Sequence, residues 1–209
     1  MRLQLLVIAK APVPGRVKTR LCPPCTPEQA AGIAAAALTD TLTAAAAYPA
    51  VQYTIVHCGQ IDAGPGWRRV AQRGEGLAAR LANGFADTAA PGTASVLIGM
   101  DTPQLTPALL DAIVARLDTC DAVLGPAEDG GWWALALRDP ADAEALRGVP
   151  MSTPDTMGWT VHALRARGLR VGYGPPLRDV DTAADARHVA ALCPGGRFAA
   201  AVHENLVAA

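Results

Sequence analysis

Four basic side chains fall within eleven residues near the start of the chain: Lys10, Arg16, Lys18 and Arg20. They come directly after an apolar run at residues 3–9, which is typical of a buried strand. Lysine and arginine side chains bind phosphoryl oxygens well, and Gly15 lets the backbone approach a ligand closely. The segment therefore predicts a phosphate-binding loop; a solvated basic loop is the structural alternative.

Carboxylates follow three other strand-like runs. Asp101 follows residues 95–99, Asp129 follows residues 122–126, and Asp179 and Asp181 follow residues 170–173. Because the carboxyl ends of parallel strands meet at one edge of a sheet, we expect these groups to converge with the basic loop. Carboxylates beside a phosphate repel it, so a hard divalent cation, Mg²⁺ or Mn²⁺, is expected between them.

A structural alternative exists for each acidic residue. An Asp before a helix often accepts a backbone N–H bond, and this alternative is strongest for Asp179 and Asp185. It is weaker for Asp101, because Thr106-Pro107 looks like the start of the next helix. Asp129 lies in a Gly-Gly turn, where an Asp is as often structural as functional.

The runs between these positions predict alternating strands and helices. Strands are expected at residues 3–9, 51–58, 95–99, 122–126, 132–137 and 170–173. Helices are expected from Thr26 with a capping box to Gln29, over 77–90, from Thr106, from Ser152-Thr153-Pro154-Asp155 to near Gly168, over 183–192 and after Gly196. This order predicts an α/β fold whose mostly parallel sheet has helices on both faces, with an antiparallel element at the turn of residues 128–131.

The composition is that of a globular protein, and we expect one domain over residues 1–209. Hydrophobic residues make up 51%, charged residues 18%, and the formal net charge is −1. This balance argues against general binding to nucleic acid or membranes and favours small anionic ligands. No segment reaches transmembrane length or forms a signal-peptide core, and the odd number of five cysteines favours a reducing cytoplasm.

Two further groups of residues are interpreted as structural. Cys22-Pro-Pro-Cys25 provides only half of a zinc site and lacks a redox context, and the four histidines lack the spacing of a metal site or triad. Trp132 and Trp133 point to opposite faces if they lie in a strand. One is expected in the core, and the other is free to stack on a sugar or base.

Four segments together resemble a GT-A-fold glycosyltransferase-like family that is linked to radical-SAM and selenium-domain genes and carries an arsenosugar-biosynthesis label. They are AKAPVPGRVKTRL at 9–21, IGMDTP at 98–103, GPAEDGGWW at 125–133 and DVDT at 179–182. The chain is more distantly similar to small nucleotidyltransferases such as phospholactate guanylyltransferase.

The resemblance implies a three-layer α/β/α GT-A fold and a metal-dependent transferase that acts on a nucleotide-activated substrate. It assigns the nucleotide's phosphates to the basic loop, metal binding to Asp101, and nucleotide contacts to the segment that contains Gln72 and Gly76. With the strand-edge argument, Asp181 becomes the second metal ligand. The acceptor or sugar site is then expected at Asp129, Gly130, Gly131 and Trp132.

Two reactions fit these residues. In glycosyl transfer from a nucleotide-sugar, Asp101 and its metal hold the diphosphate and Asp129 deprotonates a hydroxyl of a small-molecule acceptor. In nucleotidyl transfer, the basic loop holds a triphosphate, and Asp101 with Asp181 aligns it for attack by a phosphorylated molecule. Pro12 and Pro14 have no N–H to donate to a triphosphate, which favours glycosyl transfer. A non-catalytic nucleotide-binding protein is the third interpretation, and a homodimer is compatible with each.

Overall fold

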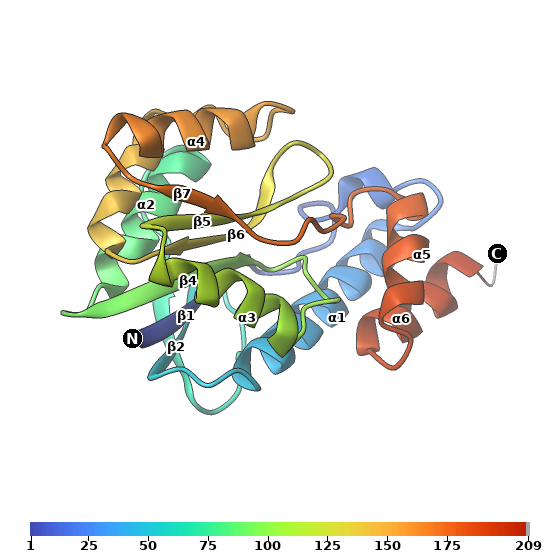
Figure 1. Cartoon of the computed structure of the whole chain (residues 1–209). Coiled ribbons are helices and arrows are strands. Elements are labelled where there is room, and N and C mark those ends of the chain that lie inside the picture. The colour runs from blue at the N-terminus through green and yellow to red at the C-terminus, as the bar shows by residue number, and fades with distance from the viewer. Residues whose placement is uncertain (208–209) are drawn as a thin grey trace.

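The computed structural model describes residues 1–207 and is built around a seven-stranded sheet of order β3-β2-β1-β4-β6-β5-β7 (Figure 1). The strands are β1 (Arg2–Lys10), β2 (Gln52–Cys58), β3 (Trp67–Ala71), β4 (Thr93–Gly99), β5 (Ala122–Pro126), β6 (Trp132–Leu137) and β7 (Val171–Tyr173). Among the strands of residues 1–207, only β6 runs antiparallel to its neighbours, β4 and β5. The mostly parallel mixed sheet predicted from the sequence is confirmed.

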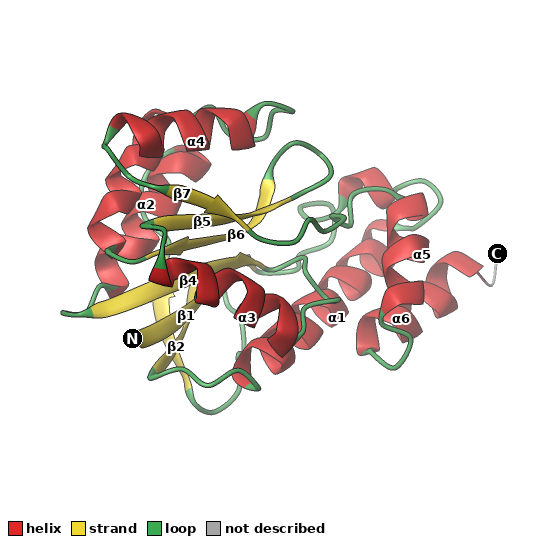
Figure 2. Cartoon of the chain, viewed as in Figure 1, coloured by secondary structure: helices red, strands yellow, loops and turns green. Residues whose placement is uncertain are grey.

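Helices cover both faces of this sheet (Figure 2). They are α1 (Pro27–Ala46), α2 (Gly76–Thr88), α3 (Pro107–Val114), α4 (Thr156–Ala166), α5 (Ala183–Leu192) and α6 (Arg197–Val202). Short helical segments are η1 (Thr19–Leu21), η2 (Ala115–Asp118), η3 (Pro140–Gly148) and η4 (His203–Val207). No helix in residues 1–207 has the length and apolarity needed to cross a membrane.

Each face of the sheet has its own hydrophobic core. On one face, Leu38 of α1 and Ile113 of α3 pack with Leu5 of β1. On the other, Phe85 of α2 and Leu164 of α4 pack with neighbouring strands. The central strands are buried on both sides, which explains their continuous apolar runs and fixes the edge at which their loops emerge.

A third cluster attaches the C-terminal helices to α1. Phe198 of α6 and Val189 of α5 pack against Ile33 of α1, together with Leu21 and Val180. Leu21 ends the basic loop, and Val180 lies between Asp179 and Asp181. The same cluster therefore holds two segments distant in sequence beside each other, as the position of α5 and α6 beside α1 in Figure 1 also shows.

Three sequence predictions of secondary structure need correction. Strand β3 was not expected; its five residues are half-buried or exposed and lie at the sheet edge, so they lack the apolar signal of a core strand. The helix predicted from Ser152 starts at Thr156 instead. The backbone of Ser152 is left-handed, with φ of 60°, and the Thr156 hydroxyl accepts from the Thr153 N–H, which makes the preceding residues a turn. Segment η3 was also not predicted.

Candidate functional site

The basic loop and the separate aspartates meet at one edge of the sheet. Strands β1, β4, β5 and β7 run in the same direction, so their carboxyl ends lie together. The loop after β1 brings Lys18 to this edge, the end of β4 brings Asp101, and the segment after β7 brings Asp181. The convergence expected from the order of elements is present.

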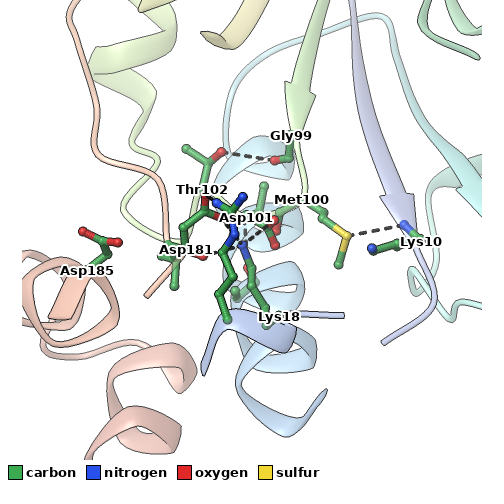
Figure 3. A network of polar contacts seen from close by, with 12 residues as sticks. Lys10, Lys18, Gly99, Met100, Asp101, Thr102, Asp181 and Asp185 are labelled. Atoms are coloured by element: carbon green, nitrogen blue, oxygen red, sulfur yellow. Dashed lines mark hydrogen bonds and ion pairs between the residues drawn. The ribbon is translucent and has the colours of Figure 1, made fainter. Parts of the chain in front are cut away.

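Lys18 is the centre of this cluster (Figure 3). Its Nζ lies 2.7 Å from Asp101 Oδ2 and 3.7 Å from Asp181 Oδ1, and it also donates to the carbonyl oxygen of Val180. Only 8% of the Lys18 side chain is exposed, so the ammonium group is not part of a solvated basic face. Arg20 adds a second contact, with NH1 3.1 Å from Asp181 Oδ2.

The backbone at Lys18 has an unusual conformation. Lys18 has φ of 47°, in the left-handed region that residues other than glycine seldom adopt. Immediately afterwards, Leu21 is fully buried in the third cluster and Thr26 caps α1. The Thr26–Gln29 capping box predicted from the sequence is confirmed, with Gln29 Oε1 2.8 Å from the Thr26 N–H. Fixed structure after the loop thus holds a strained residue in place.

The cluster lines a first cavity of about 210 Å³. Its lining combines three cations and two carboxylates: Lys10, Lys18, Arg20, Asp101 and Asp181. Three of the four predicted phosphate-binding cations therefore border one space. Cations outnumber carboxylates in this lining, so the site can receive an anion.

The remaining predicted nucleotide-binding residues are placed differently. Arg16 is exposed and does not line the first cavity, although its carbonyl accepts from Lys10 Nζ at 3.0 Å. Gly15, with φ of 72°, forms the turn before it. Gln72 Nε2 donates to the carbonyls of Ala9 and Val56, which ties the ends of β1 and β2 together. Gly76 begins α2 and lines neither cavity described here.

The donor set fits a divalent cation that also binds a ligand. Asp101 Oδ1 is buried without a hydrogen-bond partner, while Oδ2 of the same carboxylate meets Lys18. Within the described part of the chain, no group of three or more His, Cys, Asp or Glu residues could hold a metal alone. Asp101 and Asp181 could therefore supply two ligands, with ligand oxygens and water completing the shell, as is common for Mg²⁺.

A second cavity of about 210 Å³ adjoins the first and contains the other two aspartates. Gly99 and Asp179 line the second cavity, whereas Asp101 and Asp181, each two residues further on, line the first. Burial raises the pKa of Asp179 to about 7, together with the negative charge of Asp129 and a hydrogen bond with it; Lys18 opposes this shift. Asp129 and Asp179 thus form a close carboxyl pair.

The turn between β5 and β6 positions Asp129 in this cavity. Asp129 Oδ1 accepts from the Gly131 N–H at 2.8 Å, so the carboxylate also shapes its own turn. Gly130 has φ of 89°, and a Cβ there would lie 1.9 Å from the Pro154 carbonyl oxygen. The Met157 N–H donates to the Gly130 carbonyl at 2.9 Å. Close packing on the start of α4 therefore fixes the turn.

The two tryptophans divide as expected between core and cavity. Trp133 is 2% exposed, and its indole N–H donates to Pro175 at 3.0 Å. Trp132 lines the second cavity with Asp129 and Gly131, and its N–H donates to Thr160 Oγ1 at 3.2 Å. Of the predicted acceptor group, only Gly130 is absent from the lining.

The sequence predicts that Asp129 and Asp179 converge at one edge of the sheet, but it does not predict their direct pairing. The helix-cap interpretation is correct for Asp185, which completes a capping box with Thr182, but wrong for Asp179, because Thr182 caps α5. The chain after β7 continues beside the hairpin, where the Glu128 N–H donates to Leu177 and Arg178 Nε lies 2.7 Å from Glu128 Oε2. That long-range pairing leaves no local signal.

The remaining groups singled out in the sequence have other environments. All five cysteines are free, and Cys25 is buried beside Leu21 in the third cluster. Burial is the main cause of the raised pKa of the Cys25 thiol, and this shift opposes thiolate chemistry at neutral pH. Asp101 does not cap α3, because Thr106 accepts from the Leu109 N–H.

Solved structures share this fold. A "putative nucleotide-diphospho-sugar transferase" from Desulfovibrio desulfuricans G20 is 27% identical, with a TM-score of 0.86 over 98% of this chain and 95% of that one. CMP:2-keto-3-deoxy-manno-octonic acid synthetase complexed with CTP is 12% identical, with a TM-score of 0.60 over 93% of this chain and 99% of that one. Rv0371c of Mycobacterium tuberculosis H37Rv in complex with manganese is 20% identical, with a TM-score of 0.55 over 90% of this chain and 98% of that one.

The last two likenesses show a common fold alone. Together with the Desulfovibrio structure they confirm the predicted nucleotide-diphospho-sugar transferase-like fold. The sequence matches no curated protein. A family model described as "Uncharacterized protein conserved in bacteria (DUF2064)" matches residues 32–153, more than half of the chain. The match includes β4, Asp101 and the Asp129 turn, and the chain belongs to the DUF2064 family.

Proposed function

We propose that this protein is a metal-dependent glycosyltransferase, formed by a single GT-A-like domain, that uses a nucleotide-sugar. The cluster of Lys18, Arg20, Asp101 and Asp181 around one cavity at the carboxyl edge of the sheet carries the proposal. The name of the Desulfovibrio protein, 27% identical over nearly the whole chain, supports it. The narrower resemblance to the radical-SAM-linked glycosyltransferase-like family points the same way.

In this proposal the first cavity receives the diphosphate. Lys10, Lys18 and Arg20 provide donors for phosphoryl oxygens, and Lys18 is largely shielded from water, so its charge is weakly screened. Asp101 and Asp181 would hold Mg²⁺ or Mn²⁺, which would supply positive charge against the diphosphate leaving group. Lys18 occupies the space between these carboxylates and moves to the phosphate when the nucleotide binds.

The acceptor in this proposal approaches from the second cavity. The Asp129 carboxylate is fixed by its turn and takes the proton of an acceptor hydroxyl, which makes that oxygen a better nucleophile. Trp132 presents a ring whose N–H is already bonded, so only its face and edge are left for contact. The two cavities therefore provide separate places for a leaving group and a nucleophile.

Nucleotidyl transfer is the second candidate function. The observation that favours it is the number of cations in the first cavity, which suits a triphosphate as well as a diphosphate. The released product distinguishes the two reactions. Glycosyl transfer releases a nucleoside diphosphate, whereas nucleotidyl transfer releases pyrophosphate. A non-catalytic nucleotide-binding protein releases neither while still binding nucleotide.

The proposal is tested first by ligand-dependent thermal stability. Nucleoside diphosphates, triphosphates and nucleotide-sugars are screened with and without Mg²⁺ or Mn²⁺, because a ligand of the native state raises the apparent melting temperature. We expect a stabilising nucleotide whose effect increases with metal and is lost in Lys18→Ala. Arg116→Ala is the control, since Arg116 is exposed on η2, ahead of β5 and away from this edge. No stabilisation by any nucleotide contradicts the proposal.

Turnover is tested with Asp101→Ala once a nucleotide-sugar has been found. We expect release of nucleoside diphosphate to fall by roughly a hundredfold or more, because transition-state charge loses its stabilisation. An unchanged circular dichroism spectrum and melting temperature within a few degrees show that the variant is folded. Full activity in that variant rules out the role given to Asp101.

A further inference from the structure

The second cavity differs from the first in its charge. Its polar lining includes the paired carboxyl groups of Asp129 and Asp179, and none of its lining residues is Lys, Arg or His. The first cavity, by contrast, has three cations. An anionic group entering the second cavity would meet these carboxyl groups and no basic side chain in the lining. Lys18 acts on Asp179 from the first cavity but offsets the burial and the negative charge there only in part, so electrostatics disfavours phosphorylated groups.

The apolar part of the lining indicates what can enter instead. Leu81 and Leu97 form a floor that continues into the core on the α2–α4 face, and Trp132 adds an aromatic ring. Because Thr160 already bonds the indole N–H, Trp132 contributes an apolar surface. A lining that combines carboxyl oxygens with apolar surface matches a ring that has hydroxyl groups at its rim and C–H groups on its face.

The size of the cavity limits the ring to a small one. Its volume of about 210 Å³ is below the roughly 300–1,000 Å³ of pockets that hold drug-sized ligands. Resting on the proposed function, we propose that the second cavity binds an uncharged hydroxylated ring of monosaccharide size and rejects its phosphorylated counterpart. Asp129 and Asp179 bond the hydroxyl groups, and Trp132 packs on the ring face. The second substrate of this enzyme is then an alcohol and not a phosphate ester.

The experiment uses matched neutral and phosphorylated probes: glucose with glucose 6-phosphate, and myo-inositol with inositol 1-phosphate. Binding is read at the second cavity from the ¹⁵N-indole resonance of Trp132 in the full chain, assigned with Trp132→Phe. Trp159, which is 50% exposed on α4, is the internal reference. Inorganic pyrophosphate at saturating concentration keeps phosphorylated probes out of the first cavity.

We expect at least one neutral probe to shift the Trp132 resonance, and its phosphorylated partner to bind roughly tenfold more weakly or not at all. Asp129→Asn should weaken the neutral probe roughly tenfold, because it replaces a charged acceptor. It keeps the oxygen that bonds Gly131 and should remain folded. The control is Asp155→Asn, which removes an exposed carboxylate that makes no cap bond and does not line the cavity.

Tighter binding of a phosphorylated probe at Trp132 overturns the inference, and so does the absence of a Trp132 shift with every probe. Failure here is separable from failure of the proposed function. If nucleotides stabilise the protein through Lys18 but phosphorylated rings occupy the second cavity, only this inference is wrong. If neutral rings shift Trp132 but no nucleotide binds, the glycosyltransferase proposal fails and the cavity assignment stands.

Discussion

Lys18 places an ammonium group between two carboxylates that we assign to a metal. With Nζ 2.7 Å from Asp101 and 3.7 Å from Asp181, it neutralises part of the charge that would attract a divalent cation. A metal and this lysine therefore compete for the same two carboxylates. Metal binding should become favourable when a phosphate gives the ammonium group another partner.

The competition is tested with Lys18→Met in the absence of nucleotide. Removing the ammonium group leaves Asp101 and Asp181 uncompensated, so we expect the Kd for Mn²⁺ to fall roughly tenfold. The measurement is titration of free Mn²⁺ by electron paramagnetic resonance. Lys10→Met is the control, because Lys10 lines the same cavity but bonds the Arg16 carbonyl. Equal Mn²⁺ affinity in both variants contradicts the competition.

Single residues show where sequence reasoning succeeds and where it fails. Asp101 was separated correctly from helix caps, because the cap residue Thr106 lies nearby in the sequence. For Asp179 the helix cap was only the alternative to convergence, and Thr182 provides that cap; its direct neighbour, Asp129, lies fifty residues away along the chain. The left-handed backbone of Lys18 and the burial of its side chain were not predicted, because lysine favours neither.

At the level of elements, the start of α1 fixes the end of the basic loop. The Thr26 hydroxyl accepts from the Gln29 N–H at 3.3 Å, and we expect Thr26→Ala to lower the free energy of unfolding by about 1 kcal/mol. Thr39→Ala is the matched control, since Thr39 is exposed within the same helix and alanine favours helix. Urea unfolding compares the two. A larger loss in Thr39→Ala would refute the assignment of the cap.

The edge strand β7 pairs with β5 through its backbone, and an ion pair between Asp121 and Arg170, the residues just before the two strands, adds to this pairing. Both Asp121 oxygens accept from the Arg170 guanidinium at 3.0 Å, and Asp121 also bonds the Arg170 N–H. These hydrogen bonds, led by the side-chain pair, lower the pKa of Asp121 from 3.8 to about 2. A carboxylate with a lowered pKa stabilises the fold above its unfolded pKa and loses that contribution as the pH falls towards the folded pKa.

We therefore expect Asp121→Asn to lower the free energy of unfolding by about 1 kcal/mol at pH 7. The expected loss is small because solvent screens this partly exposed pair. The difference from the wild type should shrink between about pH 4 and pH 2. Urea unfolding at several pH values within the folded range measures it, with the exposed Asp118→Asn as the control. A difference that stays constant down to pH 2.5 would disprove the linkage.

Element prediction was accurate where burial and local capping agree. The boundaries of β5 and β6 follow directly from their apolar runs, and α5 begins at the residue after its capping Thr182. Strand β3 was not predicted, because an edge strand needs no continuous apolar pattern. The predicted start of α4 at Ser152 was wrong, because the local hydroxyl contacts are made by Thr156, where the helix begins.

At the scale of the whole molecule, each of the two cavities combines segments from both halves of the sheet. The first half supplies the basic loop and the end of β4, and the second supplies the β5–β6 hairpin and the segment after β7. Contacts such as Lys18 to Asp181 join segments more than 160 residues apart in the chain. The small net charge of −1 therefore gives no indication of the cations and carboxylates that gather around the first cavity.

Because different contacts hold the two cavities in shape, a substitution should be able to impair ligand binding in one cavity and leave binding in the other unchanged. A Cβ on Gly130 would lie 1.9 Å from the Pro154 carbonyl oxygen, and its φ of 89° is itself unfavourable for alanine. We expect Gly130→Ala to lower the unfolding free energy by roughly 2–4 kcal/mol and to weaken neutral rings at Trp132, while nucleotide binding through Lys18 is retained. Thermal unfolding and the indole resonance measure these effects.

Gly158→Ala on α4 is the matched control for this variant, because a Cβ there meets no atom within 4 Å and the residue is helical. It should leave stability unchanged or raise it by up to about 1 kcal/mol. If Gly130→Ala abolished nucleotide stabilisation together with ring binding at a temperature where the variant is folded, the two cavities would be one coupled site. Loss of ring binding alone would show that the hairpin positions only the second substrate.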